Sequence, residues 1–118
     1  MMHQIVFLLL YLLKMKPLSS NHSAWVYILT NRYNTTLYTG ITTDLSTRLW
    51  EHRTKSDPKS FTARYNLYKL VYFEGFDTIV EAVAYEKFIK GKTRNWKESL
   101  IQKLNPEWND LSDVTYTL

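Results

Sequence analysis

Hydrophobic and polar positions follow a strand pattern in two short stretches near the beginning of the chain. The residues from Ala24 to Leu29 (AWVYIL) and from Thr36 to Ile41 (TLYTGI) are rich in β-branched and aromatic side chains, and a short polar loop separates them. This composition favours strands, and so short a connection joins them as an antiparallel pair. We therefore predict a β-hairpin that presents one tyrosine on each strand, Tyr27 and Tyr38.

Three later stretches repeat apolar residues at the helical period, and a residue that can cap a helix precedes each one. They run from Leu45 to about Arg53 after Thr43 or Asp44, from Ile79 to Lys90 after Thr78, and from Arg94 to Leu104 after Thr93. Side-chain oxygens at such positions accept hydrogen bonds from the first backbone amides of a helix. Gly91 and the pair Asn105-Pro106 would end the second and third helices. We therefore predict three helices.

A third strand is predicted from Tyr68 to Glu74, with Gly75 ending it. Strict alternation places Tyr68, Leu70 and Tyr72 on one face, and Lys69, Val71 and Phe73 on the other. The order strand, strand, helix, strand, helix, helix predicts an α/β protein of the α+β type. Its core would be one three-stranded sheet that contains an antiparallel pair and is flanked by helices.

Two polar side chains flank the apolar stripe of the first predicted helix. Leu45 and Leu49 form that stripe, and Arg48 and His52 are four residues apart directly beside it. Because neither side chain can point fully into water, they predict a small polar pocket next to the two hairpin tyrosines. A surface helix with an ion pair to Glu51 explains the same charges without a functional site.

Glu86 is expected on the inward face of the second helix, together with Ile79, Ala82 and Val83. A carboxylate among apolar neighbours is costly unless it is paired with a cation or metal, hydrogen-bonded or protonated. The residues leave two explanations open. One is a structural ion pair with Arg48 or Lys90, and the other is a metal ligand.

The chain has 118 residues, a net charge of +4 and no cysteine. This length gives one domain and excludes a separate DNA-reading module, while the missing cysteines exclude disulfides and thiolate metal sites. The positive charge is compatible with a polyanionic partner. Candidate phosphate contacts are Arg53, Lys55, Lys59, Arg64 and Lys90. For the loop residues among them, a solvated loop is the alternative interpretation.

An apolar run from Ile5 to Leu13 precedes the hairpin. About nine residues are too few to span a bilayer, which needs about 20, and the run lacks the flanks of a signal peptide. We predict an apolar appendage and linker over residues 1–23, a functional domain over 24–111 and a fraying tail over 112–118. The appendage either docks a partner or lies upstream of a true start at Met15. A cytoplasmic location is expected.

Several motifs in fixed order resemble the GIY-YIG nuclease superfamily. They are W-V-Y at 25–27, Y-T-G at 38–40, R-L-W-E-H at 48–52, A-V-A-Y-E-K-F-I-K-G at 82–91 and N-P-E-W-N-D-L at 105–111. The chain is similar in particular to small stand-alone members that resemble the N-terminal nuclease domain of the bacterial excision-repair incision subunit. It departs from the pattern at Trp25, where the first half-motif has glycine, and at Ile41, where repair-type members carry lysine.

The resemblance implies a role for each candidate residue. Tyr27 would orient or deprotonate the attacking water, and Tyr38 would position the phosphate or tune Tyr27. Arg48 would bind phosphate oxygens, and His52 would assist proton transfer. Glu86 would be the single protein ligand of Mg²⁺ or Mn²⁺. The family asparagine has three candidates, namely Asn95, Asn105 and Asn109.

The sequence therefore predicts a metal-dependent phosphodiester endonuclease with weak or structure-directed specificity, connected to DNA repair. DNA is favoured over RNA as the substrate, and a protein partner or homodimer stays open. Two alternatives belong to other classes. One is a nucleic-acid-binding module with weak or lost catalysis, and the other is an interaction domain whose apolar N-terminus docks a partner.

Overall fold

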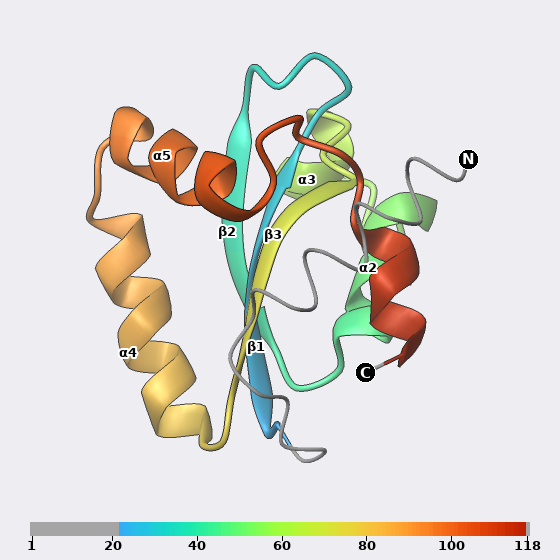
Figure 1. Ribbon diagram of the computed structural model, residues 1–118. Helices are drawn as coiled ribbons and strands as arrows, with labels where there is room; N and C mark the ends of the chain where they lie inside the picture. Colours follow the sequence, from blue (N-terminus) through green and yellow to red (C-terminus); the bar gives the residue numbers. More distant parts are fainter. Residues whose placement is uncertain (1–21, 118) are drawn as a thin grey trace.

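A three-stranded antiparallel sheet with helices on both faces forms the molecule (Figure 1). The structure is a computed structural model that describes residues 22–117. The elements are the strands β1 (Ala24–Thr30), β2 (Leu37–Thr42) and β3 (Lys69–Phe76), the helices α2 (Leu45–Thr54), α3 (Phe61–Arg64), α4 (Ile79–Lys90) and α5 (Arg94–Leu104), and the 3₁₀ helix η1 (Ser112–Thr117). The predicted fold class and the order of its six main elements are thus confirmed.

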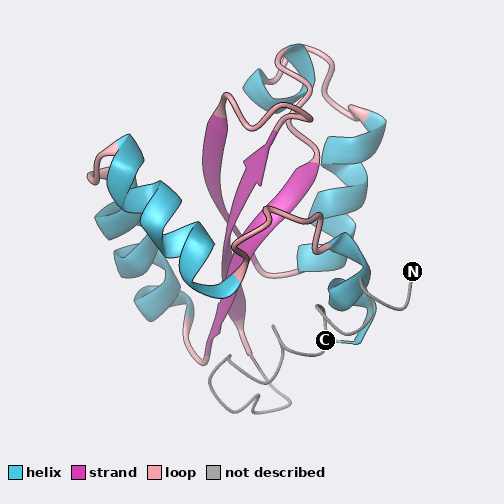
Figure 2. Cartoon of the chain, turned by 45° about the horizontal axis from the view of Figure 1, so that its top comes forward, coloured by secondary structure: helices cyan, strands magenta, loops and turns pink. Residues whose placement is uncertain are grey.

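Strand β1 is the centre of the sheet and is buried along its whole length. Its odd-numbered residues Trp25, Tyr27 and Leu29 face the core beneath α2 and η1. Its even-numbered residues Val26 and Ile28 face the core beneath α4 and α5. Figure 2 shows the sheet between these two helical layers. Tyr27 therefore points into the layer that contains α2.

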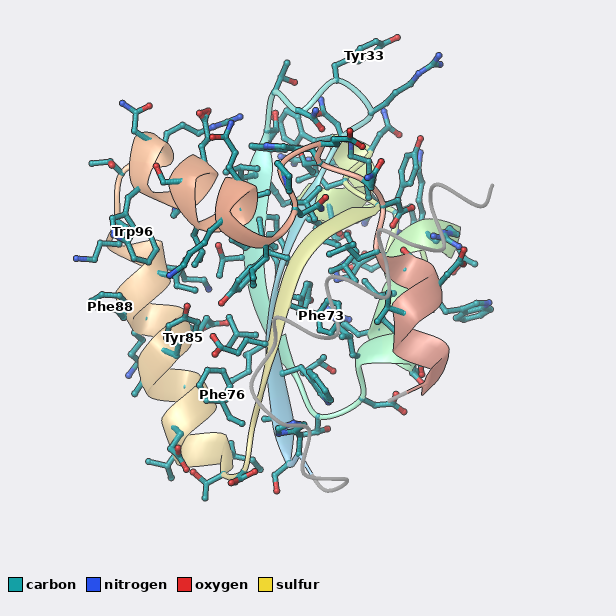
Figure 3. All side chains as sticks on the ribbon, in the orientation of Figure 1. Tyr33, Phe73, Phe76, Tyr85, Phe88 and Trp96 are labelled. Carbon is teal, nitrogen blue, oxygen red and sulfur yellow. The ribbon has the colours of Figure 1, made fainter. Side chains whose placement is uncertain are left out.

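A bulge in β3 breaks the alternation that the sequence predicted. The pairing with β1 shifts between Ile28, opposite Tyr72, and Leu29, opposite Leu70, so Val71 is the extra residue. Leu70 consequently shares the α2 side with Phe73, whereas Val71 and Tyr72 both pack on the α4 side. In Figure 3, Phe73 lies toward α2 and Phe76 toward α4. The expected grouping of Leu70 with Tyr72 was wrong for this reason. The strand also continues through Gly75 to Phe76.

The caps that the sequence indicated all form. Asp44 caps α2, Thr78 caps α4 and Thr93 caps α5, each by accepting from a backbone amide three residues later. The buried side of α4 differs from the prediction, because Ile79 and Val83 are exposed. Ala82 is buried as predicted, and the other buried residue of the helix is Ile89.

The segment after α5 crosses to the other face of the sheet and closes the outer edge of β3. The amide of Leu111 donates to the carbonyl of Leu70 over 2.8 Å, and the amide of Leu70 donates to a carboxylate oxygen of Asp110 over 3.2 Å. Val114 in η1 is buried in the core beneath α2. Ser112, Val114 and Thr115 are therefore packed, where the sequence led us to expect fraying.

The predicted N-terminal appendage lies outside the described residues up to position 21. His22 and Ser23, placed in the linker by the sequence, already contact the domain, because the Ser23 amide donates to the Phe76 carbonyl over 2.8 Å. The His22 ring packs edge-on against Trp25. Within residues 22–117, none of the helices has the length and apolarity needed to cross a bilayer.

Candidate functional site

A buried chain of hydrogen bonds joins β1, α2 and α3. The hydroxyl of Tyr27 lies 2.9 Å from Nε2 of His52, and Nδ1 of His52 lies 2.8 Å from the hydroxyl of Thr62. A protonated phenol donates, so Nε2 accepts and the neutral imidazole donates its Nδ1 hydrogen to Thr62. The i+4 spacing from Arg48 and the burial of Leu45 and Leu49 orient His52 toward the sheet. This chain fixes one tautomer of His52, with Nε2 available as a base.

Gly40 makes room for the Tyr27 ring. The two residues face each other across β1 and β2, and a Cβ on Gly40 would lie 2.5 Å from both the Cζ and the hydroxyl oxygen of Tyr27. The ring therefore rests on the backbone of the edge strand β2. Any larger residue at position 40 would displace it. The glycine of the Y-T-G motif thus has a packing role that the motif alone does not reveal.

Burial keeps both members of the Tyr27–His52 pair uncharged at neutral pH. Desolvation raises the pKa of Tyr27 far above its usual value of 10, although the Arg48 guanidinium beside the phenol partly opposes the rise. Desolvation, with a smaller effect from the Arg48 charge, lowers the pKa of His52 to about 4. The two groups therefore face each other as a phenol and a neutral imidazole.

Tyr38 and Arg48 complete one side of the site. The Tyr38 ring lies 5.8 Å from the His52 ring and 6.3 Å from the Tyr27 ring, measured between centroids. Arg48 forms an ion pair of 3.7 Å with Glu51, and its side chain is 40% exposed. Arg48 can therefore exchange Glu51 for another anion at little cost, because ion pairs of this exposure contribute little to stability.

A polar cavity of about 250 Å³ opens beside His52. Its lining consists of Arg48, Glu51, His52, Lys55, Ser56, Asp57, Ser60 and Thr62. Two cations, two carboxylates, hydroxyl groups and a neutral imidazole converge there. Arg48 can bind a phosphate group if its side chain leaves Glu51. The cavity brings His52, and not the buried Tyr27, into contact with any ligand that reaches Arg48.

Glu86 approaches the site from the other side of the sheet. Its helix α4 and the Arg48 helix α2 lie on opposite faces of the sheet (Figure 1). Burial is the largest cause of the raised pKa of Tyr27, and the Glu86 charge adds a small further rise. The Glu86 side chain is 15% exposed, and its carboxylate lies 3.6 Å from the Lys90 ammonium nitrogen. Of the two partners considered for an ion pair, the structure therefore selects Lys90.

The described side chains fit a divalent cation that takes most of its ligands from water and substrate. In residues 22–117, no three side chains of His, Cys, Asp or Glu come together to hold a metal. Mg²⁺ commonly takes only one or two carboxylates and completes its octahedron with water and substrate phosphate. Glu86 could thus hold such an ion when nucleic acid supplies the remaining oxygens.

The candidate phosphate contacts divide between two regions. Lys55 lines the cavity and donates to the side chain of Asn66, and Arg64 lies beside the Tyr65 ring. Lys59 is exposed on the same loop. Arg53 instead turns toward Asp110, with a separation of 3.5 Å.

The sequence did not identify Thr62 or the helix α3 that carries it. Four helical residues are too few to show periodicity, and the one local signal is the N-cap Ser60, which accepts from the Ala63 amide. Among the asparagine candidates, Asn105 is buried and its side chain is bonded to backbone groups of Val71 and Asn109. Asn105 thus braces the turn after α5.

The low pKa of His52 makes stability depend on pH. Because the native pKa of about 4 lies below the ordinary 6.5, stability is complete above pH 6.5 and falls as pH decreases toward 4, by about 3 kcal/mol. We expect His52→Gln to remove most of this slope, since glutamine does not titrate. Thermal melts of both proteins between pH 7 and pH 4.5 test this. Parallel curves would show that His52 titrates normally in the folded protein.

Comparisons with known proteins agree on one family. Residues 23–99 match the GIY-YIG catalytic domain. A UPF0213 protein of Streptococcus agalactiae is 40% identical over 80 residues, covering 68% of this chain and 89% of that protein. One of Clostridium perfringens is 42% identical over 77 residues, covering 65% and 81%. The solution NMR structure of the UPF0213 protein from Bacillus halodurans is 28% identical, covers 74% of this chain and 90% of that one, and has a TM-score of 0.48.

Proposed function

This chain belongs to the GIY-YIG family, and on that premise we propose that it is a metal-dependent endonuclease that hydrolyses phosphodiester bonds in nucleic acid. One observation carries the proposal. The Tyr27 phenol is hydrogen-bonded to a neutral histidine whose ring borders a polar cavity that Arg48 also lines. A core tyrosine needs a hydrogen-bond partner, but it does not need an arginine beside its hydroxyl group and a polar cavity beside that partner.

Arg48 has two effects on a bound phosphate. Its guanidinium fork can bind two non-bridging oxygens and stabilise the charge that accumulates on them during attack. A phosphate on Arg48 also offsets the positive charge that helps to keep the pKa of His52 low. Substrate binding thereby makes His52 a better proton acceptor at the moment when one is needed.

The Tyr27–His52 bond provides a path for that proton. A water molecule near the phenolic oxygen can give it a proton while the phenol passes its own proton to Nε2 of His52. Because both transfers occur together, no free phenolate forms, which agrees with the raised pKa of Tyr27. Thr62 accepts from Nδ1 and holds the imidazole in the orientation that this transfer needs.

Glu86 would hold Mg²⁺ or Mn²⁺ together with substrate oxygens. Bound there, the ion would supply positive charge for the phosphate and for the departing oxygen. The position of Glu86, electrostatically coupled to Tyr27, supports this assignment. DNA is the proposed substrate, recognised by its structure more than by its sequence, and a role in DNA repair is the corresponding cellular proposal.

A cleavage assay tests the function directly. The full chain is incubated with Mg²⁺ or Mn²⁺ and a panel of single-stranded, duplex, flapped and branched DNA and RNA. Cleavage that stops when EDTA is added supports the proposal. Binding without cleavage on every substrate would replace it with a binding module, and absence of both would exclude nucleic-acid chemistry.

We expect Arg48→Lys to slow cleavage by about a hundredfold, because an ammonium group cannot reproduce the two-pronged contact with phosphate. The matched control is Arg53→Lys on the same helix, where the arginine pairs with Asp110 away from the cavity. Its rate should stay near that of the unmodified protein. Equal rates for both variants and the unmodified protein would remove Arg48 from the phosphate site. Cleavage rates at saturating metal provide the measurement.

A further inference from the structure

A row of aromatic rings leads from the buried phenol to the surface. The His52 ring follows Tyr27, the Tyr38 ring follows His52, and Phe61 stacks on Tyr38 with a centroid distance of 6.4 Å and an interplanar angle of 29°. Tyr65 ends the row 4.7 Å from Phe61. The row thus begins in the core and ends on α3.

The last two rings are exposed although the core does not require them there. Phe61 is 45% exposed and Tyr65 is 49% exposed, whereas Thr62 and Ala63 between them are buried. The inner side of α3 is therefore already occupied by two small residues. Two neighbouring rings left in water are costly, and their position calls for a flat apolar ligand.

Cationic and polar groups surround these two rings. The Arg64 guanidinium carbon lies 5.8 Å from the centre of the Tyr65 ring. Phe61 lies between Ser60 and Thr62, two of the residues that line the cavity containing Arg48 and Lys55. A ligand that is flat and apolar at one end and anionic at the other matches this arrangement. A nucleotide has that form.

We propose that Phe61 and Tyr65 are a stacking platform for an unpaired nucleobase next to the phosphate held by Arg48. The proposal rests on the proposed function and adds a substrate preference to it. A base can cover the rings only if it has left its own duplex stack, so the preferred substrate contains a single-stranded segment or an extruded base at the cleavage site. An apolar protein surface is a less suitable ligand for Phe61 and Tyr65, because Arg64 and a charged cavity border the two rings.

Binding without metal tests the platform separately from catalysis. The probe is a short fluorescent thymidine oligonucleotide in EDTA, titrated with the full chain and followed by anisotropy. We expect Tyr65→Ala to weaken binding by about tenfold, as for other aromatic side chains that stack on a base, and the double change Phe61→Ala/Tyr65→Ala to weaken it further. Tyr65→Phe should bind normally. The matched control is Tyr33→Ala, because Tyr33 is 73% exposed at the hairpin tip (Figure 3) and is neither part of the row of rings nor a lining residue of the cavity.

The nature of the loss distinguishes stacking from charge. Tyr65→Ala should leave the salt dependence of binding unchanged, since no phosphate contact is removed. The same strand annealed to its complement should lose little affinity in the variant. An oligonucleotide with abasic sites should bind the unmodified protein as weakly as the normal strand binds the double variant Phe61→Ala/Tyr65→Ala. The abasic oligonucleotide should bind Tyr65→Ala with the same affinity as it binds the unmodified protein.

The outcomes separate the two proposals. If the unmodified protein neither binds nor cleaves nucleic acid, the proposed function fails and the platform fails with it. If it cleaves, but Tyr65→Ala and the double variant bind the thymidine strand normally, only the platform is overturned. Equal losses on single strand and duplex would also overturn it, because a shared loss indicates a contact with the backbone. Melting curves confirm that these exposed positions leave the fold unchanged.

Discussion

Replacing Glu86 with glutamine is expected to abolish metal-dependent cleavage while the protein melts at nearly its normal temperature. Glutamine keeps the size of the side chain and can still form hydrogen bonds, but it removes the charge needed to hold a divalent ion. The fold should tolerate the change because the ion-pair partner Lys90 is 53% exposed. Releasing such a cation into water costs at most about 1 kcal/mol, far below the roughly 3–5 kcal/mol for an uncompensated buried cation.

Glu98→Gln is the matched control for this experiment. Glu98 also forms an ion pair four residues away in its helix, with Arg94 at 3.1 Å, but it lies on α5. Its variant should cleave normally. The measurements are cleavage rate against Mg²⁺ concentration, melting temperature and nucleic-acid binding in EDTA. An active Glu86→Gln protein would exclude Glu86 as the metal ligand, and an inactive but grossly unstable one would make Glu86 a structural residue.

Gly40→Ala is expected to reduce cleavage by at least a hundredfold and to lower stability by about 1–3 kcal/mol. The added methyl group would stand 2.5 Å from the Tyr27 hydroxyl, with backbone on one side and a close-packed core on the other. The ring must tilt, and the hydrogen bond from Tyr27 to His52 breaks as it does so. Cleavage rate, thermal melting and the His52 ring signals in NMR spectra record these effects.

Gly91→Ala provides the comparison for Gly40→Ala. Position 91 ends α4 with a φ of −80°, and the nearest atoms to an added Cβ are 3.7 Å away. Alanine fits such a site and should leave activity and stability near their normal values. If Gly40→Ala behaved in the same way, the close approach of Tyr27 to β2 would not be needed for the site.

Local patterns in the sequence were sufficient to predict the order of the six main helices and strands and most of the residues at which they begin and end. Caps such as Asp44 and Thr93 act within four residues, so a single chain displays them. The bulge at Val71 has no such signature, because it depends on how β3 registers against β1. Likewise, the exposed side of α4 depends on which residues the sheet leaves room for, and apolar spacing alone led us to place Ile79 inside.

The positions of the candidate site residues were predictable where they follow the periodicity of a helix or a strand. Arg48 and His52 are related by the pitch of one helix, and Tyr27 is on the inward side of its strand. Thr62 could not be found in this way, because it reaches His52 through a loop whose path no periodicity describes. Similarly, the roles proposed for Phe61 and Tyr65 depend on their exposure, which only the folded chain reveals.

The contact between Leu70 and the pair Asp110–Leu111 also affects how this protein is made. Strand β3 is at the edge of the sheet, and an edge with free amides and carbonyls is a template for intermolecular pairing. The hydrogen bonds from positions 110 and 111 cover that edge at the bulge. A nascent chain therefore carries an open β edge until residue 111 has left the ribosome. Translation that stalls before this point yields a nearly complete domain that is prone to aggregation.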